Sequence, residues 1–286
     1  MKILIFGGSG FLGKNLALQL CKNHKVTVFD KKNFKNFRKY NIKFIKGNIL
    51  NFKQVLNATK KQDIIYNFAG ISDIGDAMFQ PILTTKVNIL GSIYTLEAAV
   101  KNKVKRYIFA SSIYVLSRQG GFYKSSKKSV ESFIDEYNKK DKLKYTILRF
   151  GSVYGNDSDP RNGIQKLLTS AIKDKTIIYG GTSKAERRFL HVDDAAKASI
   201  IILKNKFINK RVLITGNKKT KIKKLIAIIQ KILKTNKKIK FKRKPMMGHY
   251  DKNPFNDFPK KQIIYQVKPS INLLDGLIAI LSNIKK

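Results

Sequence analysis

The stretch Lys2-Ile3-Leu4-Ile5-Phe6-Gly7-Gly8-Ser9-Gly10-Phe11-Leu12-Gly13 decides the fold of this chain. Its apolar run is typical of a buried strand, and residues 11–21 have helical periodicity. Gly7, Gly10 and Gly13 allow a tight turn and a close approach of the backbone to a pyrophosphate, which the free N–H groups of the helix N-terminus attract. A turn without a ligand is the alternative, but glycines between a strand and a helix favour dinucleotide binding.

Asp30 ends the next strand-like run, residues 26–29. It follows the glycine loop by ~20 residues, the spacing at which an acid contacts the adenosine ribose of a bound dinucleotide. A carboxylate accepts both ribose hydroxyls and repels a 2′-phosphate, so Asp30 favours NAD over NADP. Lys31 and Lys32 follow immediately and would soften that preference. The alternative is a surface aspartate at a strand end.

Strand-like and helical stretches alternate along the first half of the chain. Strands are expected at residues 43–45, 64–68, 107–110 and 145–150, with helices between them at 85–101 and 123–137. This alternation predicts an α/β fold, a Rossmann-type doubly wound parallel sheet with helices on both faces. We expect residues 1–155, with a returning segment at about 181–205, to form an NAD-binding domain. Residues 156–180 and 206–286 would form a smaller C-terminal substrate-binding domain.

The composition limits the alternatives. The chain has 286 residues and a formal net charge of +41, from 59 basic and 18 acidic side chains. The lysines are scattered over every segment, so solvated lysine faces explain them better than a specific nucleic-acid site, although anionic ligands would benefit from the field. Cys21 is alone and the three histidines are dispersed, so neither an internal disulfide nor a metal site is expected. No apolar run is long enough for a signal-peptide core or a membrane span, and we expect a cytoplasmic protein.

Tyr123 and Lys127 lie four residues apart in the helix predicted at residues 123–137, which places both side chains on one face. An ammonium group there would favour the phenolate and lower the pKa of Tyr123 from its usual value near ~10, so that the tyrosine could act as a base. This spacing recurs by chance in a lysine-rich chain. Its weight therefore depends on the glycine loop and on Ser111-Ser112, which either end a strand at the ligand crevice or cap a turn.

The order of these motifs resembles that of the extended short-chain dehydrogenase/reductases, specifically the NAD-dependent epimerase/dehydratase family acting on nucleotide sugars. The motifs are the glycine loop, Asp30, Asn67-Phe68-Ala69-Gly70, Ser111-Ser112, Tyr123 with Lys127, Leu148-Arg149-Phe150-Gly151-Ser152-Val153-Tyr154-Gly155, and Arg187-Arg188-Phe189-Leu190-His191-Val192-Asp193-Asp194. The resemblance covers nearly the whole chain. Several motifs in the right order are far more specific than any one of them.

The resemblance implies roles for individual residues. Ser112, Tyr123 and Lys127 would be catalytic. The cofactor NAD would contact Gly7, Gly10, Phe11, Leu12, Gly13, Asp30, Lys31, Asn48, Ile49, Phe68, Ala69, Gly70, Asn88, Tyr123 and Lys127. The nucleotide-sugar substrate would contact Ser72, Ser112, Ser152, Arg187 and Arg243. Asn48 and Ser152 replace the acid and the asparagine that the family usually has at those places, and only eleven positions separate Ser112 from Tyr123. Because of these differences from the family pattern, the substrate specificity of the family cannot be assigned to this chain.

Within the resemblance, the implied reaction is C4 epimerisation of a UDP-hexose through a keto intermediate. Ile113-Tyr114 stand where family dehydratases carry an Asp-Glu pair, which argues against dehydration. A nucleotide-sugar reductase or dehydrogenase using the same three catalytic residues is the alternative, and a non-catalytic nucleotide- or RNA-binding protein on the same fold is a more remote one. The family commonly dimerises through two long helices, which correspond to residues 85–101 and 123–137 here, so a homodimer is expected.

Overall fold

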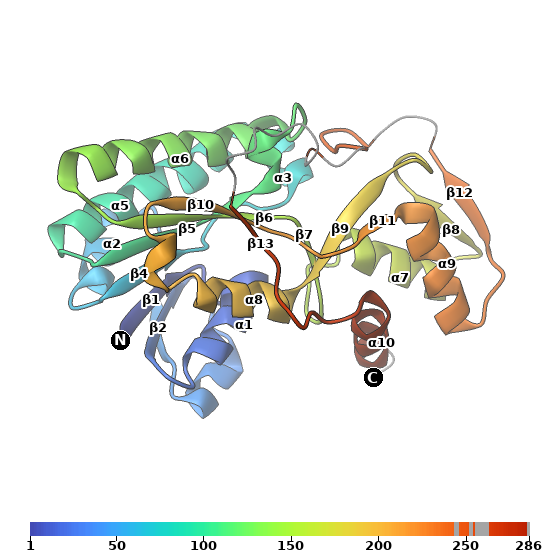
Figure 1. The fold of residues 1–286 in the computed structure, drawn as a ribbon, viewed down its shortest axis with the longest axis horizontal. Helices are drawn as coiled ribbons and strands as arrows, with labels where there is room; N and C mark the ends of the chain where they lie inside the picture. Colours follow the sequence, from blue (N-terminus) through green and yellow to red (C-terminus); the bar gives the residue numbers. More distant parts are fainter. Residues whose placement is uncertain (243–245, 252–253, 255–262, 285–286) are drawn as a thin grey trace.

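The computed structural model describes residues 1–242, 246–251, 254 and 263–284. Within this part of the chain, eight parallel strands form one sheet in the order β13-β10-β6-β5-β4-β1-β2-β3 (Figure 1). The strands are β1 (Lys2–Phe6), β2 (Lys25–Asp30), β3 (Lys43–Lys46), β4 (Ile64–Asn67), β5 (Arg106–Ser112), β6 (Tyr145–Phe150), β10 (Lys210–Ile214) and β13 (Ile263–Tyr265). The predicted Rossmann-type fold class is confirmed.

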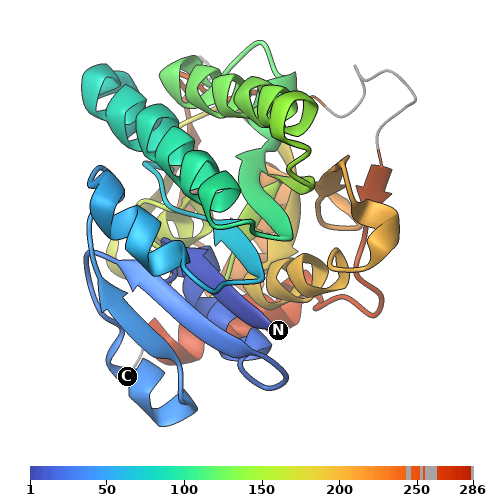
Figure 2. The same ribbon diagram turned by 90° about the vertical axis from the view of Figure 1, so that its left-hand side faces the viewer.

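Helices cover both faces of this sheet (Figures 1 and 2). Helices α1 (Phe11–Leu20) and α8 (Val192–Ile201) pack on one face, and α2 (Phe52–Thr59), α5 (Gly91–Lys101) and α6 (Gly121–Asp141) pack on the other. Successive strand residues point to opposite faces, so Ile3 and Ile5 join the first apolar cluster while Leu4 and Phe6 join the second. Burial on both faces explains why the strands are continuously apolar.

A third apolar cluster lies beyond the carboxyl ends of the strands. Helices α7 (Gly163–Lys173), α9 (Ile222–Leu233) and α10 (Leu273–Ile284) surround it with the strand pair β8 (Thr176–Tyr179) and β12 (Lys238–Phe241). A small sheet of β7 (Ser152–Tyr154), β9 (Glu186–His191) and β11 (Lys219–Lys221) lies between this cluster and the large sheet (Figure 1).

The division into two domains stays a prediction, but one of its boundaries needs correction. Strands β10 and β13 fall within residues 206–286, which we expected in the smaller domain, yet both extend the large sheet. Strand β10 pairs with β6 along its whole length, from Lys210 opposite Thr146 to Ile214 opposite Phe150. The physical reason is that β6 would otherwise leave a row of unpaired backbone groups at the edge of the sheet.

Shorter elements connect the layers. They are η1 (Lys35–Tyr40), α3 (Ile74–Phe79), α4 (Pro81–Thr84), the π-helical turn η2 (Thr85–Leu90), η3 (Ile113–Leu116) and η4 (Asn205–Phe207). Residues 85–101, predicted as one helix, therefore form the π-helical turn followed by α5. None of the helices in the described part of the chain combines the length and apolar character that a membrane crossing requires.

The strand order reverses between β1 and β4, since β1 leads on to β2 on one side while β4 lies on its other side. In open α/β sheets the ligand crevice lies at such a reversal, outside the carboxyl ends of the strands. The residues that follow β1 and β4 and end β5 are the glycine loop, residues 68–72 and Ser112. The topology thus brings the three predicted motifs to one edge.

Candidate active site

A cleft of about 300 Å³ opens at this edge of the sheet. Its walls contain all the residues predicted for the catalytic centre and the phosphate loop, together with three other predicted contacts. These residues are Ser112, Tyr123 and Lys127, then Gly7, Gly10, Phe11, Leu12 and Gly13, and finally Phe68, Gly70 and Ser72. The prediction did not include the other lining residues, which are Ala110, Ser111, Phe150, Gly151 and Val153. All of these lie at or just beyond the ends of β5 and β6, where only the pairing of the two strands brings them into the cleft.

The glycine loop is shaped for a ligand. A Cβ atom on Gly7, which has a φ of +73°, would lie 2.5 Å from the backbone N of Ala69, and one on Gly13 would lie 2.3 Å from the carbonyl of Gly7. Those two glycines are required by packing within the chain. Gly10 differs, because its Cβ would meet only the carbonyl of Gly7 at 3.3 Å and would otherwise enter the open cleft.

Helix α1 begins at this loop without a side-chain cap. The N–H groups of its first turn therefore lack partners within the helix and carry its positive dipole end at the cleft wall. Uncapped donors beside an unhindered glycine fit a bound diphosphate, which is the central group of a dinucleotide.

Asp30 holds the loop from the side. Its carboxylate accepts hydrogen bonds from the backbone N of Ser9 at 3.0 Å and from that of Lys31 at 2.7 Å. Oδ1 also accepts from the backbone N of Lys32 at 3.4 Å, whereas Oδ2 keeps a free lone pair that can accept from a ribose hydroxyl. Asp30 and Lys31 do not line the cleft, but they lie beside the loop that does.

Ser112 and Tyr123 meet at the base of the cleft. The Oγ of Ser112 accepts from the backbone N of Tyr114 at 3.3 Å, which caps the turn η3, and it also hydrogen-bonds the side chain of Tyr123. Both interpretations of Ser112, a cap and a group in the crevice, therefore hold. Gly120 and Gly121, with φ values of +111° and +48°, turn the chain from the short connection into α6.

Lys127 is buried below Tyr123. Its Nζ donates to the carbonyl of Ala110 at 2.8 Å and lies 6.0 Å from the centre of the Tyr123 ring. Burial lowers the pKa of Lys127 to about 8, and the charge of Glu131 opposes this shift. Burial also raises the pKa of Tyr123, while the hydrogen bond from Ser112 lowers it. The expected lowering of the pKa of Tyr123 by Lys127 is thus not observed, because desolvation outweighs the stabilisation of the phenolate.

Asn88 supports this centre from the π-helical turn η2. Its side-chain amide accepts from the backbone N of Ile71 at 2.7 Å and donates to the hydroxyl of Ser126 at 3.0 Å. It therefore ties the loop after β4 to the first turns of α6, between Tyr123 and Lys127. Asn88, which was predicted to contact the cofactor, is buried and is not among the residues that line the cleft.

Three further residues predicted to contact the cofactor also lie outside the cleft lining. Asn48 is exposed and its Oδ1 caps the backbone N of Leu50 at 3.1 Å, whereas Ile49 is buried in the apolar cluster under α5. Ala69 packs against the glycine loop, where its backbone N would meet a Cβ on Gly7.

The predicted substrate residues other than Ser72 and Ser112 lie elsewhere. The guanidinium of Arg187 stacks on Tyr250, with 4.2 Å between its central carbon and the ring centre, and Tyr250 hydrogen-bonds Ser152. Arg187 also donates to the carbonyl of Glu186 at 2.8 Å. Neither Ser152 nor Arg187 lines the cleft, and Arg243 lies outside the described residues.

An aromatic cluster that the sequence did not reveal connects Tyr123 in the cleft with Arg187 and Ser152 outside it. The Tyr114 ring lies 6.2 Å from that of Tyr123 and 5.0 Å from that of Tyr250, and its hydroxyl hydrogen-bonds Nδ1 of His249 at 2.9 Å. Burial, together with the charge of Arg187, lowers the pKa of His249 to about 4, so this imidazole is neutral at pH 7. No local spacing links Tyr114 to residues so far along the chain.

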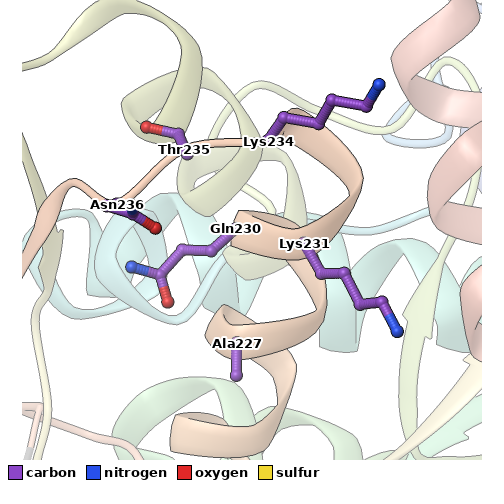
Figure 3. A pocket seen from close by; sticks show the side chains of 6 residues that line it. All are labelled: Ala227, Gln230, Lys231, Lys234, Thr235 and Asn236. Atoms are coloured by element: carbon purple, nitrogen blue, oxygen red, sulfur yellow. The ribbon is translucent and has the colours of Figure 1, made fainter.

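A second hollow, of about 320 Å³, lies at the carboxyl end of α9 (Figure 3). It is lined by Ala227, Gln230, Lys231, Lys234, Thr235 and Asn236, and the two lysine side chains extend away from Gln230 and Asn236. The amide of Gln230 already donates to the carbonyl of Lys237 at 2.9 Å. The negative end of the helix dipole faces this hollow, so it suits an anionic ligand poorly.

Comparisons with known proteins agree with this geometry. The model of the NAD dependent epimerase/dehydratase family matches residues 3–214. The chain is 32% identical over 240 residues to the dTDP-D-glucose 4,6-dehydratase of Dictyostelium discoideum, a match that covers 71% of this chain but only 55% of that protein. It is 27% identical over 258 residues to a putative UDP-glucose 4-epimerase of Methanocaldococcus jannaschii, which covers 80% of this chain and 81% of the relative.

Among solved structures, the UDP-glucuronic acid 4-epimerase of Bacillus cereus, in complex with UDP-glucuronic acid and NAD, has a TM-score of 0.86. The two sequences are 24% identical, and the match covers 100% of this chain and 99% of that structure. At this identity the likeness shows a common fold, including the part of the chain beyond residue 214.

Proposed function

The chain belongs to the NAD-dependent epimerase/dehydratase family, and from this membership we propose that it is an enzyme that epimerises a UDP-hexose at C4. One observation carries the proposal. Ser112, Tyr123 and Lys127 line the same cleft as the uncapped start of α1. A proton-transfer centre thus faces a place built for a diphosphate.

The cofactor of the family fits these residues. The backbone of residues 7–13 would hold the pyrophosphate of NAD, Asp30 the adenosine ribose and Lys127 the nicotinamide ribose. NAD bound in this way supplies a hydride acceptor and donor, which epimerisation at a carbinol carbon requires.

The chain's own residues provide the acid and the base. The phenol of Tyr123 would take the proton of the substrate hydroxyl and later return it, and Ser112 would hydrogen-bond the same substrate oxygen. Lys127 holds its charge close to the ring, which favours the phenolate in spite of burial. Val153 and the apolar ring of Phe150 also line the cleft and would help exclude water.

Dehydration is the activity of one of the relatives, and the turn η3 argues against it here. Elimination needs an acid and a base next to the serine. Ile113 is apolar and buried, and Tyr114 is bonded to His249 rather than to a carboxylate. A nucleotide-sugar reductase or dehydrogenase remains the second candidate, since it would use the same three residues as the epimerase.

The decisive experiment incubates the purified protein with individual UDP-hexoses and no added cofactor, and follows the C4 configuration by NMR. Interconversion of the two C4 epimers to a constant ratio, with no net NADH, supports the proposal. Stoichiometric NADH without the second epimer would show a dehydrogenase instead. A protein that binds NAD and nucleotides but converts none of the sugars would be a binding protein.

We also propose a cytoplasmic homodimer. Side chains of α3, α4, η2 and α6 leave a band of large apolar groups exposed, namely Phe79, Ile82, Leu90, Phe122 and Phe133. These elements pack against one another, and apolar groups exposed on neighbouring elements of a charged protein favour contact with another protein surface. The lone, partly buried Cys21 agrees with a reducing compartment.

A further inference from the structure

A buried carboxylate lies one helical turn beyond Lys127. Glu131 is 4% exposed and its Oε1 accepts from the hydroxyl of Ser111 at 2.6 Å and from Nε of Arg149 at 3.0 Å. Its Oε2 accepts from Nη2 of Arg149 at 2.5 Å. One side chain of α6 therefore reaches the ends of both β5 and β6.

The bidentate contact with Arg149 explains why the carboxylate tolerates burial. It does not explain the short hydrogen bond from Ser111, which lines the cleft and directly precedes Ser112. That bond fixes the strand end from which Ser112 reaches Tyr123. A counter-ion for Arg149 alone would need no contact with this strand.

The second contribution of Glu131 is electrostatic. The charged and titratable groups around Lys127 and Glu131 in the described structure are Tyr123 on α6, Arg149 on β6 and Arg211 on β10, and Arg211 in turn pairs with Asp135. Burial lowers the pKa of Lys127, and the negative charge of Glu131 raises it. Glu131 therefore helps to keep Lys127 protonated near neutral pH.

We propose that Glu131 is a positioning residue of the proton-transfer centre, which holds Ser111 and hence the Ser112 strand end, and keeps the ammonium of Lys127 charged. The role of the centre in catalysis rests on the proposed epimerase function. The two contacts of Glu131 do not, because they can be measured without substrate.

The test is Glu131→Gln in the full-length chain, with competitive acetic anhydride labelling of the lysines across pH and mass spectrometry of the peptides. Lys127 should label at a pH lower by roughly one to two units than in the unchanged protein, the size expected for a unit charge one turn away at an effective dielectric constant near 20. The exposed neighbour Lys128 serves as the internal reference. Glu136→Gln, an exposed acid on the same helix that pairs with Lys139, should leave the labelling of Lys127 unchanged.

Two further variants separate positioning from simple loss of the fold. Glu131→Gln with Arg149→Gln removes the carboxylate without leaving an unpaired guanidinium. The labelling of Lys127 should shift in the same direction as in the single variant but by less, because a positive charge is removed as well. Ser111→Ala removes only the strand contact, and it should lower kcat several-fold with labelling unchanged.

The outcomes distinguish this proposal from the proposed function. Labelling of Lys127 at the original pH in folded Glu131→Gln would reduce Glu131 to a counter-ion of Arg149 and overturn the inference, even in an active epimerase. A shift in labelling in a protein that converts no UDP-hexose would support the placement of Glu131 and overturn only the function. In an active enzyme, the alkaline limb of the pH dependence of kcat should move down together with the labelling curve.

Discussion

Tyr123 has its hydroxyl at a place where a phenolate is costly. Burial raises its pKa, and the hydrogen bond from Ser112 opposes that rise. Lys127, which we expected to favour the phenolate, donates one of its N–H groups to the carbonyl of Ala110. At the residue scale, the phenol of Tyr123 is thus in its acid form, and the Lys127 ammonium lies near the phenol rather than bonded to it.

Tyr123→Phe should remove proton transfer while leaving the cleft intact. We expect kcat for epimerisation to fall by roughly 10²–10⁴-fold, the usual contribution of a positioned acid or base, with little change in NAD affinity. Tyr137→Phe, farther along the same helix, is the matched control and should retain full activity. Retention of activity by Tyr123→Phe would show that another group carries the proton.

Among the elements, the glycine loop contains one glycine that packing requires and another that faces the cleft. The carbonyl of Gly7 occupies the space that a side chain on Gly13 would need, whereas Gly10 faces open space. A methyl group at the two positions therefore has different consequences, although both glycines belong to one motif.

Gly13→Ala should lower the free energy of unfolding by roughly 2–3 kcal/mol, the cost of overpacking a rigid site, as measured by denaturant titration. Gly10→Ala should unfold like the unchanged protein but bind NAD roughly tenfold more weakly, because its methyl group would occupy the cleft. Equal NAD affinity in folded Gly10→Ala would place the pyrophosphate elsewhere.

The connection from β7 to α7 forms a strap, residues 156–162, that contacts both α1 and α3. The Nζ of Lys14 on α1 bonds Asp157 at 2.6 Å, and Arg161 pairs with Asp76 on α3. Helix α1 follows β1 and α3 follows β4, the two strands that flank the reversal of the sheet. Ion pairs on both sides thus hold the strap between the helices that follow β1 and β4.

Lys14→Met should release one side of the strap. We expect NAD to dissociate about two- to fivefold faster at low salt, as for the loss of one partly exposed ion pair, and the difference should shrink at high salt. The change in NADH fluorescence when the reduced cofactor is released measures the rate, and Lys22→Met, at an exposed lysine just after α1, is the control. An unchanged rate would mean that the strap does not retain the cofactor.

At the scale of the whole molecule, the exposed apolar band bears on assembly. Phe133 on α6 is 40% exposed, and Phe133→Asp should place a charge in the proposed dimer interface. Light scattering should then give the mass of one chain, 32.7 kDa, where the unchanged protein gives twice that value. Ile178→Asp, an exposed apolar residue on β8, should remain dimeric, and a monomeric unchanged protein would contradict the proposal.

The sequence by itself determined the parts of this protein that depend on short-range geometry. The strand, glycine turn and helix of residues 2–20, the alternation that builds the parallel sheet, and the helical spacing of Tyr123 and Lys127 all follow from fixed local periods. The carboxyl ends of parallel strands meet at one edge, so these local motifs also predicted the place of the cleft.

Only the tertiary structure decided which distant residues meet. Arg187 and Ser152 turn towards Tyr250 rather than line the cleft, β10 and β13 join the large sheet, and Ser111 finds Glu131. Partners of this kind are separated by tens of residues or lie on different elements, and no period in the sequence relates them. Their contacts follow from how helices and strands pack, where burial forces each polar group to find whichever partner the fold brings within reach.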